Sequence, residues 1–193
     1  MDVFSYLLGK KSGGGGGGNY SISMDSTLTY STTYGLKSII NDIKAFDTTG
    51  ITSFEGFFTG CSGIKTVPIL DLKNIEILSL CFSSCTSFET MPLWDTKNVT
   101  AMLSCFYGCT NLKDVPILDT TSLTNAGNLF NGCNNLTDAS LDNILQMFMN
   151  ASNYTGSKTL YALGFRKTKY SQSKFESLPH WSDFVSAGWE TGY

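Results

Sequence analysis

Six cysteines give this chain side chains that could bind a metal ion or form disulfide bonds. They fall into two series with a step of 24 residues, Cys61, Cys85, Cys109 and Cys133, and Cys81 and Cys105. Residues one step apart in a stack of repeats lie in a line, about 4.8 Å from each other. A tetrahedral zinc instead needs four sulfurs at about 2.3 Å from one point, and a disulfide needs Cβ atoms about 3.8 Å apart. The spacing favours reduced thiols packed as small apolar side chains, and we expect no metal and no cofactor.

The other candidates for catalysis are one histidine and a series of aspartates, His180 and Asp47, Asp71, Asp95 and Asp119. A Cys/His nucleophile needs both side chains together, but His180 lies in the C-terminal segment, far from the cysteines in the sequence. The aspartates lie one step apart in identical settings, which favours binding of turn amides over an acid/base pair. We therefore expect no catalytic residue, and an enzyme is the last of three functional alternatives.

The same step of 24 residues relates nearly every apolar position, which indicates a repeat protein. It relates four phenylalanines and three prolines, Phe58, Phe82, Phe106 and Phe130, and Pro68, Pro92 and Pro116. One such unit cannot bury its own apolar face and must stack on its neighbours. We expect the four phenylalanines to form one continuous buried stack.

Two patterns alternate within each unit. In the third unit, apolar residues three to four positions apart predict a helix of one or two turns, with Asn98 or Thr100 as N-cap and Gly108 at its end; these residues are Val99, Met102, Cys105 and Phe106. Leu112, Val115 and Ile117 then approach the pattern of a leucine-rich-repeat strand, which Pro116 interrupts. The expected fold class is an α/β repeat: a short leucine-rich-repeat solenoid with parallel short strands on one side, short helices on the other, and caps at both ends.

Five segments are expected along the chain. Residues 1–11 are an apolar docking peptide, 12–19 a Gly-rich linker, 20–45 an N-terminal cap repeat, 46–139 four 24-residue repeats, and 140–193 a C-terminal cap. In the C-terminal cap, an amphipathic pattern predicts a helix of about ten residues from Ser140; it comprises Leu141, Ile144, Leu145 and Phe148. We expect a strand over 159–165, a polar stretch over 166–177 and a last short helix over 181–187.

The N-terminal peptide carries five apolar side chains, Val3, Phe4, Tyr6, Leu7 and Leu8. They are too few to build a core, and a flexible glycine tether would let them reach a groove on a partner. The alternatives are a disordered tail or an extra strand folded back on the N-terminal cap. A phosphate-binding loop is not expected, because Asn19 and Tyr20 follow the glycines where that loop needs Gly-Lys-Ser/Thr.

Charge and hydropathy narrow the partners. The net charge is −3 and the sequence pI is about 5.0, so no basic field exists to hold nucleic acid. No window approaches the roughly 18 apolar residues of a membrane span, and the N-terminus lacks the basic region of an export signal. We expect synthesis in a cytoplasm and protein or glycan partners. The candidate contact surface is the outward sheet face, which carries Lys65, Thr66, Glu89, Thr90, Lys113 and Asp114.

The repeats resemble the BspA-type leucine-rich repeats of surface proteins from Firmicutes and mycoplasmas. The match to the pattern Asp-Thr-x-x-Val-Thr-x-Met-x-x-Met-Phe-x-Gly-Cys covers 46–139 and rests on Asp95-Thr96, Val99-Thr100, Met102, Phe106 and Gly108-Cys109. The second Met of the pattern is replaced by Phe57, Cys81, Cys105 and Leu129. This resemblance implies an interaction or adhesion module.

Both ends of the chain look like the termini of small proteins encoded among the structural genes of phages that infect gut Firmicutes. This second resemblance implies a virion-associated protein, a tail or capsid decoration, whose N-terminal peptide binds a virion component while the repeats bind a host-surface protein or glycan. Its expected location is the virion, after synthesis in the host cytoplasm. The rival interpretation is a bacterial leucine-rich-repeat surface adhesin or a cytoplasmic scaffold.

Overall fold

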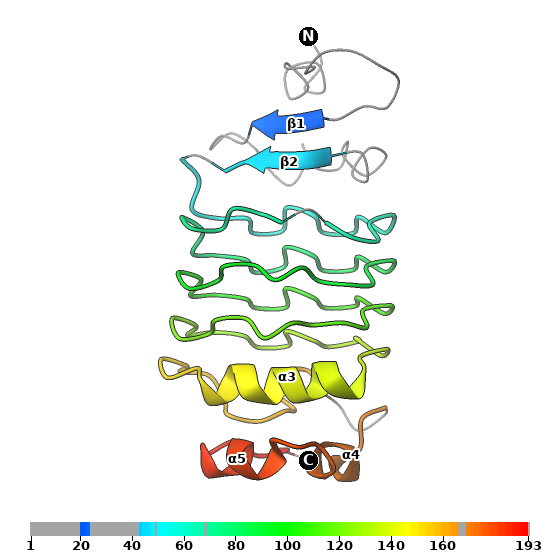
Figure 1. Cartoon of the computed structure of the whole chain (residues 1–193), viewed down its shortest axis with the longest axis vertical. Helices are drawn as coiled ribbons and strands as arrows, with labels where there is room; N and C mark the ends of the chain where they lie inside the picture. Colours follow the sequence, from blue (N-terminus) through cyan, green and yellow to red (C-terminus); the bar gives the residue numbers. More distant parts are fainter. Residues whose placement is uncertain (1–19, 24–42, 49, 68, 166–168, 193) are drawn as a thin grey trace.

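The computed structural model describes residues 20–23, 43–48, 50–67, 69–165 and 169–192. Strand β1 (Tyr20–Ser23) pairs in parallel with β2 (Ile43–Asp47). Beyond β2 the chain winds through stacked coils to helix α3 (Asp138–Met149), and then to α4 (Gln172–Glu176) and α5 (Trp181–Ser186) at the far end of the stack (Figure 1). The expected docking peptide, the linker and most of the N-terminal cap repeat lie outside the described residues.

The coils are joined in register, one above the next. Isolated parallel bridges link positions 24 residues apart, Ser53 to Ile77, Ile77 to Ala101 and Ala101 to Asn125. Backbone N–H groups also donate from coil to coil, as from Phe58 to the Cys81 carbonyl at 2.8 Å. Phe130 continues the series by donating to the Leu163 carbonyl at 3.0 Å. Residues around 155–165 therefore form a further coil, although α3 intervenes in the sequence.

Each coil contains turns where short helices were expected. In the third unit Cys105 N–H donates to the Met102 carbonyl and Cys109 N–H to the Phe106 carbonyl, both at 3.1 Å, which closes tight turns of one residue fewer than an α-helical turn. Two columns of left-handed residues stop a helix from growing. They are Gly56, Leu80, Ser104 and Asn128, with φ of 65°, 60°, 53° and 54°, and Gly60, Ser84, Gly108 and Gly132, with φ of 68°, 61°, 72° and 84°.

The helix cap and the continuous strands expected in the repeats are also absent from the described coils. Asn98 caps no helix; its side chain donates to the Lys73 carbonyl of the preceding coil at 2.6 Å. On the side where strands were expected, the described repeats carry one isolated bridge, between Thr90 and Asp114. Proline, which lacks an N–H, prevents a continuous ladder there.

A row of nearly parallel phenylalanine rings forms the centre of the core. Ring centroids lie 4.9 Å apart between Phe58 and Phe82, 5.7 Å between Phe82 and Phe106, and 5.8 Å between Phe106 and Phe130. All four side chains are buried, as predicted. Phe165 adds a fifth ring, 5.8 Å from Phe130, and carries the row into the C-terminal cap.

Helix α3 closes the last full coil. Its predicted apolar stripe is confirmed: Leu141, Ile144, Leu145 and Phe148 are all buried. The hydroxyl of Thr137 caps it by accepting from Ser140 N–H at 3.2 Å. The buried Ser140 hydroxyl donates to the Lys113 carbonyl at 2.8 Å and accepts from Val115 N–H at 2.9 Å. The helix thus supplies the hydrogen bonds that another coil would make.

The rest of the C-terminal cap agrees only in part with the prediction from the sequence. The last short helix is confirmed as α5; Phe184 within it and Trp189 after it are buried. The strand expected over 159–165 is wrong: these residues form turns, with one isolated bridge from Thr159 to Glu190. Gly164, at φ 104°, allows this tight course. Helix α4 lies in the polar stretch over 166–177, where no helix was predicted.

Candidate functional site

The cysteine columns are buried in the core. The thiols of Cys85, Cys109 and Cys133 each donate to the carbonyl of a phenylalanine on the preceding coil, at 3.0 to 3.1 Å. All six cysteines are free thiols. Burial raises the pKa of the thiols of Cys81, Cys105, Cys109 and Cys133 well above the ordinary value. Because the thiolate is the reactive and metal-binding form, these side chains act as packing groups.

The aspartate column binds turn amides, as predicted. Asp71 accepts from Lys73 N–H at 3.1 Å and Asp95 from Lys97 N–H at 3.2 Å. Asp119 accepts from both the hydroxyl and the N–H of Thr121, at 2.6 and 2.9 Å, and these bonds lower the pKa of its carboxyl. The side chain of Asp47 lies outside the described set.

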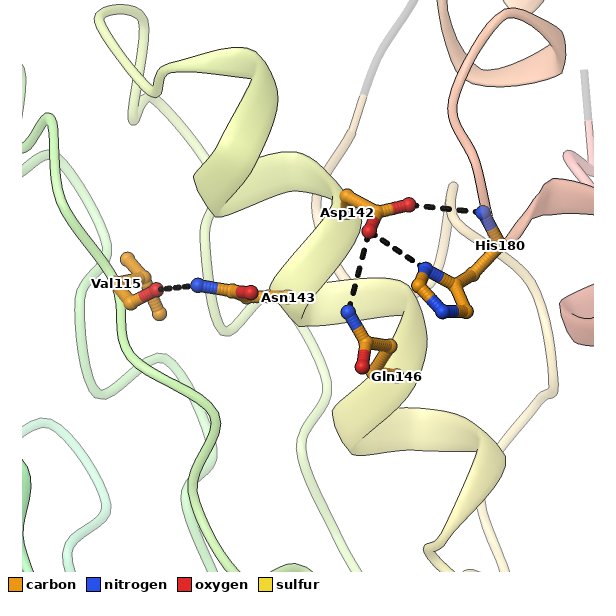
Figure 2. A network of polar contacts seen from close by, with 5 residues as sticks. All are labelled: Val115, Asp142, Asn143, Gln146 and His180. Carbon is orange, nitrogen blue, oxygen red and sulfur yellow. Dashed lines mark hydrogen bonds and ion pairs between the residues drawn. The ribbon is translucent and has the colours of Figure 1, made fainter.

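His180 is held by Asp142, a residue that the sequence analysis did not single out (Figure 2). Oδ2 of Asp142 lies 2.7 Å from His180 Nδ1, and Oδ1 accepts from the His180 backbone N–H at 2.9 Å. Gln146, one turn along α3, donates to Oδ2 at 3.1 Å. The signal available in the sequence was a carboxylate inside the apolar stretch of a helix.

An aspartate bound to Nδ1 can orient a histidine so that Nε2 serves as a general base. Here Asp142 also accepts a hydrogen bond from the backbone N–H of His180, the residue immediately before α5. The side chain of Asp142 is 12% exposed and that of His180 is 39% exposed. Because the carboxylate holds both the backbone and the ring of His180, the pair joins α5 to α3.

The residues of the sheet-face surface (Lys65, Thr66, Glu89, Thr90, Lys113 and Asp114) lie on three successive coils. Glu89 N–H donates to the Lys65 carbonyl at 3.0 Å, and Lys113 N–H to the Glu89 carbonyl at 2.8 Å. Lys113 Nζ also pairs with Glu89 Oε2 at 3.1 Å. Such exposed pairs contribute little to stability. The structure therefore brings these six residues together on a surface with partly paired charges.

A second surface, absent from the predicted sites, contains a hollow of about 680 Å³. We call it the polar groove; its lining includes Thr52, Lys73, Asn74, Glu76, Asn98 and Thr100. These residues come from three coils and recur at the 24-residue step, Asn74 above Asn98 and Thr52, Glu76 and Thr100 in one column. That column was visible in the sequence, but its exposure was not.

The predicted N-terminal docking residues, Val3, Phe4, Tyr6, Leu7 and Leu8, lie outside the described part of the chain. Of the helices within the described ranges, none has the length and apolar character needed to span a bilayer. In the same part of the chain, no three His, Cys, Asp or Glu side chains are grouped in a way that could hold a metal ion.

One family model matches the chain, with the description "Mycoplasma protein of unknown function, DUF285". It matches residues 27–144 and, in a second alignment, 78–184. Together the matches cover the four repeats and most of the C-terminal cap. The family is associated with BspA-like repeat proteins. No curated protein and no solved structure matches the chain.

Proposed function

We propose that this chain, which belongs to the DUF285 family, is a non-enzymatic interaction or adhesion module built as a BspA-type leucine-rich-repeat stack. The observation that carries the proposal is the register of the coils. Bridges at 24-residue steps put equivalent side chains in columns on the surface. Repeat proteins use extended surfaces of this kind to bind partners.

The side chains that could do chemistry support a binding role, because each has a structural task. The thiols pack in the core and bind carbonyls of neighbouring coils. The aspartates bind turn amides, and Asp142 holds His180 at the start of α5. The exposed columns on the sheet-face surface and in the polar groove are the surfaces left for recognition.

The proposed setting is a phage particle, with the chain as a tail or capsid decoration. The N-terminal peptide binds a virion component, and the repeat stack faces the host surface, where its partner is a protein or a glycan. The basis is the resemblance of both ends of the chain to the termini of phage structural proteins.

The test is to purify particles from the phage that encodes the chain and to search them for its peptides by mass spectrometry. We expect the chain at a fixed ratio to the major structural protein, and labelled chain should bind host cells saturably. Recovery in a bacterial envelope fraction of uninfected cells would favour the rival adhesin. Recovery only in soluble extract, without binding to cells, would contradict the proposal.

A further inference from the structure

We infer that the polar groove is a binding site for a neutral oligosaccharide. The inference rests on the proposed function and names the chemistry of the host-surface partner. The groove lies across four successive coils, from Thr52 to Ser122, and has a volume of about 680 Å³. That size falls within the roughly 300–1,000 Å³ of small-ligand sites.

The floor of the groove is held by hydrogen bonds between coils. Glu76 N–H donates to the Thr52 carbonyl at 2.7 Å, and Thr100 N–H to the Glu76 carbonyl at 2.8 Å. The Asn98 amide donates to the Lys73 carbonyl at 2.6 Å. The backbone that carries the groove is therefore fixed before a ligand arrives, which lowers the entropy cost of binding.

An amide and a carboxylate of the groove are free to bind a ligand. Asn74 and Glu76 are exposed, and within the described residues neither side chain makes a hydrogen bond or ion pair. An asparagine amide both donates and accepts, and a carboxylate accepts. A sugar presents pairs of hydroxyl groups that act in both ways, so these two side chains can bind adjacent hydroxyls.

The charges of the groove argue against an ionic ligand. Lys73 contributes one positive charge and Glu76 one negative charge, and the Lys73 ammonium already lies 3.4 Å from Asp71 Oδ2. This balance provides no field to concentrate an anionic polymer, and the net charge of the whole chain is −3. A neutral ligand is favoured because it needs no opposite charge: Lys73 stays paired with Asp71, and the Glu76 carboxylate can accept hydrogen bonds from its hydroxyls.

The composition of the lining argues against an apolar ligand. Ile51 is the apolar member of the lining and is itself buried, at 8% exposure. An apolar ligand would cover polar groups without replacing their hydrogen bonds to water. The polar groups also repeat from coil to coil, which suits a ligand made of repeating units. We expect weak binding at a single groove, strengthened by avidity where many copies share one particle.

The experiment titrates the full chain with four neutral tetrasaccharides, of glucose, mannose, galactose and N-acetylglucosamine units, by isothermal calorimetry. The test variant is N74A/E76A. The matched control is Q172A/E176A, which removes an exposed amide and an exposed carboxylate on α4, outside both candidate surfaces. Circular dichroism melting checks that both variants fold. We expect saturable binding of at least one tetrasaccharide, with Kd in the range of about 0.1–5 mM. Loss of one hydrogen bond to a neutral amide and one to a carboxylate should weaken it at least about tenfold in the test variant, while the control binds as the unaltered chain does.

Two results would overturn the inference. One is no saturable binding of any of the four sugars up to about 20 mM. The other is equal weakening in the test and control variants. Binding of labelled chain to host cells separates this failure from that of the proposed function. Cell binding that persists in N74A/E76A rejects the groove and leaves the interaction module standing, whereas unaltered chain that binds no cells rejects the module itself.

Discussion

The Cys109 thiol donates to the Phe82 carbonyl at 3.1 Å, and the same contact recurs from Cys85 to Phe58 and from Cys133 to Phe106. A residue type that elsewhere binds metals here joins one coil to the next. The periodic spacing predicted that the cysteines pack as small apolar side chains, because a column of residues cannot converge on one point; it did not predict these hydrogen bonds. The role of Asp142 was beyond such reasoning, since its partner His180 lies 38 residues away and belongs to no repeat.

Removal of one ring from the phenylalanine row should be costly. Phe106 is 1% exposed and packs against Phe82 and Phe130 at 5.7 and 5.8 Å. F106A leaves a cavity between rigid coils, so we expect a loss of about 3–5 kcal/mol in the free energy of unfolding. Urea titration followed by circular dichroism measures it. A loss below about 1 kcal/mol would show that the ring is not a core group.

Stability should fall at alkaline pH. Burial raises the pKa of the thiols of Cys81, Cys105, Cys109 and Cys133 above the ordinary 9.0 and that of Tyr170 to about 12. Above about pH 9 the unfolded chain loses protons that the folded chain keeps, so folding is disfavoured by up to about 1.4 kcal/mol per thiol per pH unit. The stabilisation that the protonated thiols give the folded chain is therefore complete below the pKa of these thiols in the unfolded chain. It is lost as the pH rises towards their pKa in the folded chain.

Urea titrations at about pH 7, 9 and 10 measure this effect as a falling free energy of unfolding. A thiol count of six after unfolding without reductant is the control that all cysteines are reduced. A flat profile over this range, or two or more missing thiols, would contradict the assignment of buried, reduced columns.

At the scale of elements, apolar residues three to four positions apart do not distinguish a helical turn from successive tight turns. The apolar spacing predicts helices over residues such as 99–106, and the structure has turns there. The difference lies in left-handed positions occupied by ordinary residues, Leu80, Ser84, Ser104 and Asn128. Their conformation depends on hydrogen bonds to the next coil, such as Ser104 N–H to the Gly127 carbonyl at 2.9 Å. Local propensity does not reveal such a bond.

The joint between the repeats and the C-terminal cap depends on a glycine. A Cβ at Gly164 would lie 2.5 Å from the backbone nitrogen of Asn131, and φ at this residue is 104°. We expect G164A to lower the free energy of unfolding by more than about 2 kcal/mol, because backbone atoms on both sides must move. Urea titration measures it.

The matched control is G188A, also at positive φ (85°) but with no atom within 4 Å of the added Cβ. It should cost only the left-handed strain, about 1 kcal/mol. Equal losses in the two variants would mean that the close approach between Gly164 and Asn131 does not exist in solution.

At the scale of the whole molecule, the 24-residue step is the property that can be read most directly from the sequence. It predicted the order of the coils and their common register, as the bridges from Ser53 to Asn125 record. The extra coil around 155–165 escaped prediction because α3 lengthens the step: Thr155 N–H donates to the Thr124 carbonyl, 31 residues earlier. The polar groove was not predicted because it exists only when successive coils lie side by side.

The N-terminal peptide should be dispensable for folding of the repeat stack and required for assembly into particles. The described core is one apolar cluster that runs from Ile51 through α3 to Trp189. Deletion of residues 1–18 should therefore leave the melting temperature of the repeat stack within about 2 °C of that of the full chain. Because the apolar side chains between Val3 and Leu8 are proposed to bind a virion component, the truncated chain should be lost from purified particles. Differential scanning fluorimetry and quantitative mass spectrometry of the particles are the two measurements.

The variant F4S/L7S, which keeps the full length, should also fail to assemble. A melting temperature lower by about 8 °C or more would mean that the segment packs on its own stack, and normal incorporation of the truncated chain would rule out the docking role.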